Sequence, residues 1–252
     1  MTTANNRTPR IVCIIEARYA STRLPGKVLM PILGKPMLGR MIERLRRART
    51  LDGIVVATSH SIADDAVETA ALQAGAGVFR GSEEDVLSRV AGAAVANRAD
   101  VIVEVTGDCP LHDPAVVDKV VADYLLGGAD FVGNIRPYST PRGTDVRVFS
   151  TEALVAIERS SEDPADREHV SLHFWEHPEQ YRLRNVLTDL GPDAANLRLT
   201  VDTSEDFQLV TAIYEELYPR NADFTIAEVV NFLAIRSDLR QLNSKVKQKA
   251  VR

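Results

Sequence analysis

The stretch RIVCIIEARYASTRLPGK, residues 10–27, joins an apolar run to a positively charged loop. Residues 10–17 are rich in β-branched side chains, which predicts a strand buried in a parallel sheet. Residues 18–27 contain Ser, Thr, Pro and Gly with three cations and no acid, which predicts a loop. Because ligands of parallel α/β sheets bind where strands end at their carboxyl edge, we expect residues 18–27 to line a ligand site.

The rest of the chain alternates between helical and strand patterns. Strands are predicted over 53–58, 77–79, 101–106 and 130–133, and later over 145–149 and 197–201. Helices are predicted over 37–49, 63–74, 83–98 (with Ser82 as N-cap), 114–126, 151–160, 165–176, 204–218 and 225–235. Residues 134–144, rich in Pro, Gly and Tyr, interrupt this alternation as a loop. The pattern predicts an α/β fold with a mostly parallel sheet sandwiched by helices.

Length and composition narrow the class of protein. With 252 residues, 45% hydrophobic and 26% charged, the chain is typical of a globular protein with one large domain, predicted over 8–238 and followed by a basic tail over 239–252. No apolar run reaches the roughly 20 residues of a membrane helix, and the N-terminus has no secretory pattern. The two cysteines, Cys13 and Cys109, are too few for a disulfide scaffold. We therefore expect a cytoplasmic protein with no membrane partner.

Positive charge is concentrated near the N-terminus. The net charge is −5, yet residues 10–49 contain ten bases and only two acids, Glu16 and Glu43. Nucleic-acid binding favours a broad basic face, so we expect no nucleic-acid partner and instead a small polyanion.

Residues 18–27 could satisfy a nucleoside triphosphate, which offers about four negative charges to guanidinium, ammonium, hydroxyl and backbone N–H groups. The candidate ligands are Arg18, Ser21, Arg23 and Lys27. Neither a Walker loop nor a Gly-x-Gly-x-x-Gly pattern is present. A solvated surface loop explains any one of these cations equally well, but it explains the group poorly.

Residues 17–27, followed by Gly34-Lys35-Pro36-Met37, resemble the opening of sugar-activating cytidylyltransferases. The resemblance includes 3-deoxy-manno-octulosonate and acylneuraminate cytidylyltransferases and the cytidylyltransferase-like proteins of spore-coat polysaccharide biosynthesis. It continues in FRGSEEDVL (79–87), TGDCPL (106–111) and TVDTSEDF (200–207), so that it spans residues 10–218. It implies a nucleotide-diphospho-sugar-transferase-like fold, CTP and Mg²⁺ as ligands, and a homodimer.

Two aspartates are candidate Mg²⁺ ligands, since Mg²⁺ prefers hard carboxylate oxygens. Asp108 follows the predicted strand 101–106, and Asp202 follows the predicted strand 197–201. Taken singly, each also fits a turn or helix-capping residue. Glu205 and Asp206 are predicted to be charges of a first helical turn and not metal ligands.

The resemblance also implies which residues bind the two substrates. Nucleotide-binding residues are expected to be Ala17, Arg18, Ser21, Arg23, Lys27, Arg80, Ser82 and Asp108, with Arg80 near the cytosine. Residues 134–196 are expected to form the acceptor-binding or dimerisation part, with Arg142, Asp145, Arg167 and His169 as acceptor ligands. Glu16 departs from the proline or glutamine common in relatives. His169, His173 and His177 have the spacing of one helical face, but a packed helix explains them better than a metal site.

These observations predict a Mg²⁺-dependent cytidylyltransferase that joins CMP from CTP to an anionic sugar or ulosonic acid and releases pyrophosphate, in surface polysaccharide or glycoconjugate biosynthesis. Its catalytic residues are predicted to be Arg18, Lys27, Asp108 and Asp202. One alternative is a glycosyltransferase on the same fold, which usually carries Asp-x-Asp where this chain has Gly107-Asp108-Cys109-Pro110. The other is a non-catalytic nucleotide-binding subunit.

Overall fold

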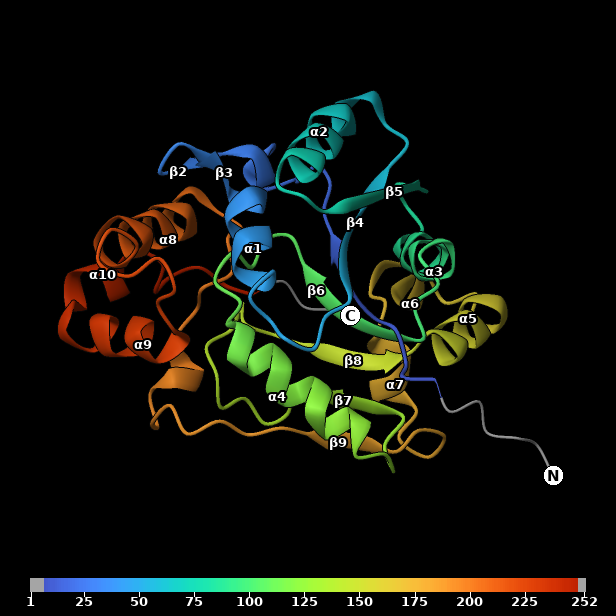
Figure 1. Ribbon diagram of the computed structural model, residues 1–252. Helices are drawn as coiled ribbons and strands as arrows, with labels where there is room; N and C mark the ends of the chain where they lie inside the picture. Colours follow the sequence, from blue (N-terminus) through green and yellow to red (C-terminus); the bar gives the residue numbers. More distant parts are fainter. Residues whose placement is uncertain (1–6, 249–252) are drawn as a thin grey trace.

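A seven-stranded sheet forms the centre of the computed structural model, which describes residues 7–248 (Figure 1). The strand order is β5-β4-β1-β6-β8-β7-β9, and every neighbouring pair is parallel except those made by β8. The strands are β1 (Ile11–Glu16), β4 (Gly53–Ser59), β5 (Gly77–Gly81), β6 (Val101–Thr106), β7 (Phe131–Gly133), β8 (Arg147–Ser150) and β9 (Leu183–Asn185). The predicted mostly parallel α/β sheet is confirmed.

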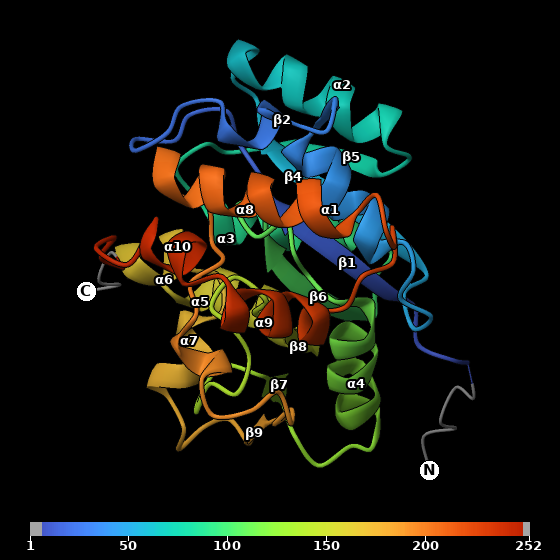
Figure 2. The same cartoon turned by 90° about the vertical axis from the view of Figure 1, so that its left-hand side faces the viewer.

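Helices cover both faces of this sheet (Figures 1 and 2). One face packs against α1 (Met37–Leu45), α2 (Asp65–Gln73), α4 (Pro114–Leu125), α8 (Ser204–Leu217), α9 (Ile226–Ile235) and α10 (Ser237–Gln241). The other packs against α3 (Val86–Ala96), α5 (Thr151–Ser160) and α7 (Leu172–Glu176), with α6 (Pro164–Glu168) beside α3. Short pieces complete the chain: β2 (Pro31–Ile32), β3 (Lys35–Pro36), and the 3₁₀ turns η1 (Lys27–Leu29), η2 (Ile62–Asp64) and η3 (Ala194–Asn196).

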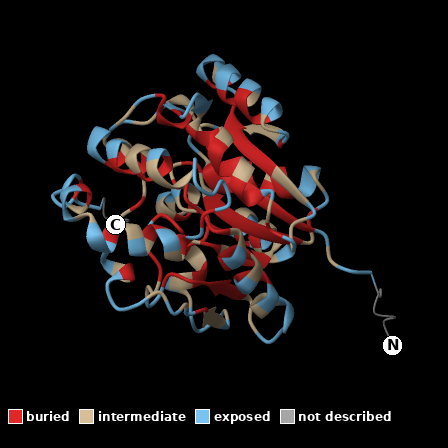
Figure 3. Cartoon of the chain, turned by 60° about the vertical axis from the view of Figure 1, so that its left-hand side comes forward, coloured by how far each residue is buried: buried red, intermediate tan, exposed pale blue. Residues whose placement is uncertain are grey.

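The side chains of β1 explain why it is central. Cys13 and Ile15 belong to the core cluster on one face, and Val12 and Ile14 to the cluster on the other, so the strand is buried on both. Figure 3 shows that buried residues are concentrated in the central strands of the sheet. Its last residue, Glu16, pairs with Ala57 of β4 and Thr106 of β6. The carboxyl ends of three parallel strands therefore meet where the positively charged loop begins.

Residues 197–201 do not form a strand of the sheet, contrary to the prediction. Their alternate side chains Leu197, Leu199 and Val201 are buried, as in a strand, which explains the error. The backbone instead pairs with a loop, through hydrogen bonds from Leu199 N to Arg142 O (2.7 Å) and from Arg142 N to Leu197 O (3.0 Å). The seventh strand is β9, which was not predicted.

Two helix predictions also need correction. The predicted helix over 165–176 is broken between α6 and α7, where Val170 turns into the core. Of the three histidines, only His169 therefore leaves the predicted helical face. The rings of His173 and His177 stay neighbours, with centroids 4.2 Å apart, and contact Asp166 and Glu179 respectively. The N-cap of α3 is Asp85, which accepts from Ser88 N (2.9 Å), whereas the hydroxyl of the predicted cap Ser82 accepts from Asp85 N.

Candidate active site

Backbone hydrogen bonds fix the start of the positively charged loop that follows β1. Ala17 N donates to Ala57 O of β4 (3.3 Å), and Tyr19 N donates to the buried carboxylate of Asp64 (2.6 Å). Gly26 turns the chain with φ of 70°, and a Cβ there would lie 2.9 Å from the ring of Tyr19, so the turn requires glycine. The loop therefore reaches Lys27 along a fixed path.

Lys27 joins the two predicted metal carboxylates. The side chain is buried, and its Nζ donates to Asp108 Oδ2 (3.1 Å), Asp202 Oδ1 (3.0 Å) and Val201 O (2.7 Å). Burial by itself lowers the pKa of Lys27, but the two carboxylates outweigh burial and raise it. The ammonium thus stays charged and brings Asp108 and Asp202 together.

Asp202 is surrounded by cations. Its Oδ1 also contacts Arg23 Nη2 (2.8 Å), and its Oδ2 accepts from Arg198 Nη2 (2.6 Å). Arg198 in turn contacts Asp206 at 3.1 and 3.2 Å. Asp206 lies in the first turn of α8 as predicted, in a capping box with Thr203, and additionally holds Arg198.

Asp108 is fixed by the turn after β6. Its Oδ1 accepts from the Thr106 hydroxyl (2.7 Å), and Gly107 N donates to Glu16 O (2.8 Å) and so ties this turn to the end of β1. Burial acts to raise the pKa of Asp108, but Lys27 and the Thr106 hydroxyl more than offset it and lower the pKa. Asp108 is therefore a half-buried carboxylate whose ionised form is stabilised. The neighbouring Cys109 has a pKa raised by burial, which does not favour a nucleophilic thiolate.

The other predicted nucleotide residues lie around this centre with varied partners. Arg18 Nη1 donates to Glu83 O (3.2 Å), and Ser21 Oγ accepts from Leu24 N (3.4 Å). Arg80 donates to Ser59 O, Ser61 O, Asp65 and Glu68, and thereby joins β5 to the β4–α2 connection. Its contact with cytosine stays a prediction.

The predicted acceptor residues fall into two groups. Asp145 contacts Arg147 (3.3 Å) and the Tyr138 hydroxyl (3.3 Å), and Arg142 lies over the Tyr138 ring at 4.6 Å. Arg167, on α6, instead bonds to Asp85, to Glu158 O and to Ser161 O, so it joins α6 to α3 and α5. His169 ends α6, and its N donates to Ala165 O.

Several site residues were missed from the sequence. Asp64 anchors the loop, Arg198 holds Asp202, and His112 joins the turn after β6 to the next loop through contacts with Cys109 O (2.7 Å) and Asp145 O (2.9 Å). On the α3 face, the half-buried Glu16 lies beside the buried Glu104, and Arg147 contacts Glu104 at 3.3 Å. A charged residue inside an apolar strand, as in VIVEVT at 101–106, is the one signal that pointed to such a buried polar group.

The donor set fits Mg²⁺ only when phosphates complete it. Within residues 7–248, no group of three or more His, Cys, Asp or Glu side chains is arranged to hold a metal. Asp108 and Asp202 supply two hard carboxylates, and Mg²⁺ is commonly bound by one or two carboxylates with substrate phosphates and water. Arg23, the more exposed of the cations on Asp202, can leave it for a phosphate without breaking the core.

Fold and site together define an α/β nucleotide-binding protein with a cationic loop facing two aspartates, Asp108 after β6 and Asp202 before α8. Residues 12–250 match the family model described as Cytidylyltransferase. The spore coat polysaccharide biosynthesis protein SpsF of Bacillus subtilis is 34% identical over 228 residues, covering 88% of this chain and 93% of that protein. The 3-deoxy-manno-octulosonate cytidylyltransferase of Anaeromyxobacter dehalogenans is 32% identical over 179 residues, covering 65% of this chain and 72% of that protein.

A solved structure is similar over nearly the whole chain. The cytidylyltransferase from Leptospira borgpetersenii superposes with a TM-score of 0.88 at 29% identity, covering 96% of this chain and 100% of that one. The chain belongs to the cytidylyltransferase family, and it is a CTP-dependent nucleotidyltransferase. None of the helices within residues 7–248 has the length and apolar character needed to cross a membrane.

Proposed function

We propose that this protein joins CMP from CTP to an anionic sugar or ulosonic acid, releases pyrophosphate, and depends on Mg²⁺. The observation that carries the proposal is the contact of Lys27, at the end of the cationic loop, with both Asp108 and Asp202. Relatives named for 3-deoxy-manno-octulosonate and for spore coat polysaccharide biosynthesis support an acidic sugar and a surface glycan.

In this proposal the side chains of the cationic loop and the two aspartates position the phosphates of CTP for the reaction. Arg18, Ser21, Arg23 and Lys27 bind the β- and γ-phosphates, and an acceptor oxygen attacks the α-phosphorus in line. Mg²⁺, held by Asp108 and Asp202 together with the phosphates, would neutralise the charge that develops on the leaving pyrophosphate. Arg142, which is exposed and lies over the Tyr138 ring, is a candidate partner for the acceptor's anionic group. Catalysis is then mainly positioning and electrostatic stabilisation.

A pyrophosphate-release screen tests the reaction. Four nucleoside triphosphates are combined with 3-deoxy-manno-octulosonate, N-acetylneuraminate, sugar phosphates and phosphonates, with and without Mg²⁺. We expect release with CTP only, with an acidic sugar and with the metal. Asp108→Asn should lower turnover at least about 100-fold, while the matched control Asp223→Asn, at an exposed aspartate that contacts Arg47, keeps most of it. Near-normal release by Asp108→Asn would overturn the assignment. CTP binding without release from any acceptor would indicate a non-catalytic subunit.

We also propose a homodimer, supported by exposed apolar side chains beside the edge strand β9. Leu126 and Leu187 are 80% and 55% exposed, and both flank the contact of α4 with residues 183–187. Light scattering should give twice the chain mass, and Leu126→Glu with Leu187→Glu should give a monomer. Ile62→Glu, at a similarly exposed position on η2, is the matched control. A monomeric wild-type protein would contradict the proposal.

A further inference from the structure

We propose that Asn243, in the segment that follows α10, is a positioning residue for the carboxylate of Asp202 and acts through Asp206 and Arg198. The inference rests on the proposed role of Asp202 in holding Mg²⁺ with CTP. It gives a function to a part of the chain for which the sequence predicts only a basic tail, residues 239–252.

The first step is the contact of the C-terminal segment with α8. The side chain of Asn243 is buried, and its amide nitrogen donates to Asp206 Oδ1 (2.7 Å) and to Arg198 O (3.0 Å). Asp206 is fully buried, and its other oxygen, Oδ2, accepts from the backbone N of Asp202 (3.0 Å) and of Thr203 (3.1 Å). One amide group therefore orients the carboxylate that holds the backbone of Asp202.

The second step is the guanidinium of Arg198. It donates to both oxygens of Asp206 and, through Nη2, to Asp202 Oδ2 at 2.6 Å. The planar fork of an arginine fixes the direction of the carboxylates that it contacts. A shift of Asp206 or of Arg198 therefore rotates Asp202, whose other oxygen faces Lys27 and Arg23.

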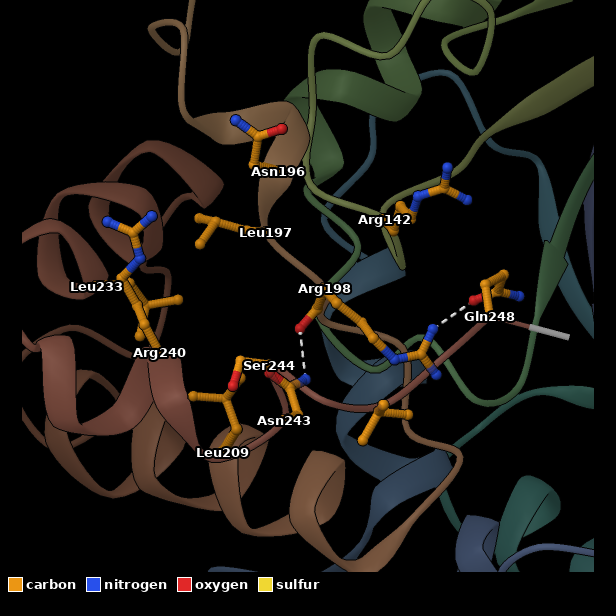
Figure 4. Close-up of a pocket in the computed structure, with 11 residues that line it drawn as sticks. Arg142, Asn196, Leu197, Arg198, Leu209, Leu233, Arg240, Asn243, Ser244 and Gln248 are labelled. Carbon is orange, nitrogen blue, oxygen red and sulfur yellow. Dashed lines mark hydrogen bonds between the residues drawn. The ribbon is translucent and has the colours of Figure 1, made fainter.

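The third step is the space beside this network. A cavity of about 450 Å³ lies between the C-terminal segment, the helices α8 and α9, and residues 196–198, and Arg198, Asn243 and Gln248 line it (Figure 4). Figure 4 shows Asn243 bonded to the backbone of Arg198 and Gln248 bonded to its guanidinium. Since close packing is missing on the cavity side, hydrogen bonds from the C-terminal segment hold Arg198 there.

Two substitutions separate positioning from packing. Asn243→Asp keeps the shape of the side chain but replaces the donating amide with an acceptor beside Asp206. Asn243→Ala removes the packing of the side chain as well as its donating amide. Lys245→Ala, an exposed position in the same segment, is the matched control. The readouts are the binding of Mn²⁺ in the presence of CTP, followed by electron paramagnetic resonance, the kcat and KM of pyrophosphate release, and the thermal midpoint of unfolding.

We expect both Asn243 variants to weaken Mn²⁺ binding about tenfold, the effect typical of a lost partner behind a metal ligand. The kcat should fall in parallel, while the KM for CTP changes less than about threefold, since the phosphate loop is untouched. Lys245→Ala should behave as wild type. Wild-type Mn²⁺ affinity and kcat in both Asn243 variants, whatever their thermal midpoints, would overturn the proposal.

A gentler variant covers the case in which the Asn243 variants do not fold. Gln248 is exposed, so Gln248→Ala removes only its contact with Arg198. It should weaken Mn²⁺ binding about two- to threefold, and unchanged binding would count against the proposal. If the wild-type protein releases no pyrophosphate with any acceptor, the proposed function fails, whereas Mn²⁺ binding in the presence of CTP still decides the role of Asn243.

Discussion

Lys27 is the residue through which two distant motifs form one site. Its ammonium replaces water for the buried Asp202 at 3.0 Å and for Asp108, whose side chain is 24% exposed, at 3.1 Å. Removing one member of a buried ionic group costs about 3–5 kcal/mol, because the remaining charges lose compensation without regaining water. The stability of the site and its chemistry therefore depend on the same contact.

We predict that Lys27→Met lowers the free energy of unfolding by about 3 kcal/mol and pyrophosphate release by at least about 100-fold. Urea unfolding measures the first effect. Millimolar Mg²⁺ should raise the thermal midpoint of the variant more than that of the wild type, because a bound cation again compensates the two aspartates. Lys35→Met removes an exposed lysine that contacts Glu43, and it should change neither quantity much. A variant as stable as the wild type would contradict this account.

At the same scale, the sequence located the residues that carry motifs and missed those that support them. Lys27, Asp108 and Asp202 do come together. The loop after β1 and the end of β6 can be predicted from local pattern, whereas Asp202 follows residues 197–201, which pair with a loop and form no strand of the sheet. Arg198 and Asn243 could not be predicted, because their roles depend on contacts between segments distant in sequence. The contacts of Arg80 and Arg167 with neighbouring helices and carbonyls could not be predicted for the same reason, and the roles of both residues in substrate binding stay predictions.

Among the elements, the ends of β1 and β6 approach so closely that the turn between Thr106 and Asp108 needs glycine. A Cβ on Gly107 would lie 2.8 Å from Ala17 Cβ and 2.9 Å from Glu16 O. Backbone atoms cannot yield without separating the two strands. The position of Asp108 therefore depends on the absence of a side chain one residue earlier.

We predict that Gly107→Ala destabilises the protein by about 1–3 kcal/mol through this overlap and lowers kcat at least about tenfold by moving Asp108. Gly39→Ala is the matched control. Gly39 lies in helix α1, where alanine is favoured over glycine, and the Cβ of the alanine would lie 3.8 Å from Pro36 Cδ, which is an ordinary contact. Chemical denaturation and pyrophosphate release measure the two effects. If Gly107→Ala and Gly39→Ala had the same stability and the same kcat, the close approach of β1 and β6 would not explain the glycine at position 107.

Helices and strands could be predicted where the hydrophobic pattern of the segment alone determines its secondary structure. The strands β1, β4 and β6 and the helix α5 agree with their predicted ranges to within a residue or two. Residues 197–201 have the alternating burial of a strand but lack a strand as partner, and β9 is a three-residue edge with no apolar run. Pairing and helix breaks are set by tertiary contacts, which periodicity does not contain.

For the whole molecule, the two faces of the sheet differ in charge as well as in the helices that cover them. The α3 face carries Glu16 and Glu104 beside Arg147, and one oxygen of each glutamate has no hydrogen-bond partner within the described chain. Burial and the neighbouring Glu104 raise the pKa of Glu16 well above its usual range, against the opposing effect of Arg89 and Arg147. Glu16 therefore keeps its proton to a higher pH in the folded protein than in the unfolded chain.

This retained proton makes global stability depend on pH in a direction that can be tested. Above about pH 4.3 the glutamate of the unfolded chain is ionised, whereas folded Glu16 stays protonated until its raised pKa is reached. The folded state thus binds more protons in that window, and the free energy of unfolding falls as pH rises, by up to about 1.4 kcal/mol per pH unit. Glu16→Gln has no proton to lose, so we predict that its stability relative to wild type grows between pH 4.5 and the raised pKa. Urea unfolding across pH 4.5–8 measures the difference, with Glu84→Gln, at an exposed position, as the control. If the free energies of unfolding of wild type and Glu16→Gln changed in parallel with pH, Glu16 would ionise as freely in the folded protein as in the unfolded chain, which would contradict the prediction.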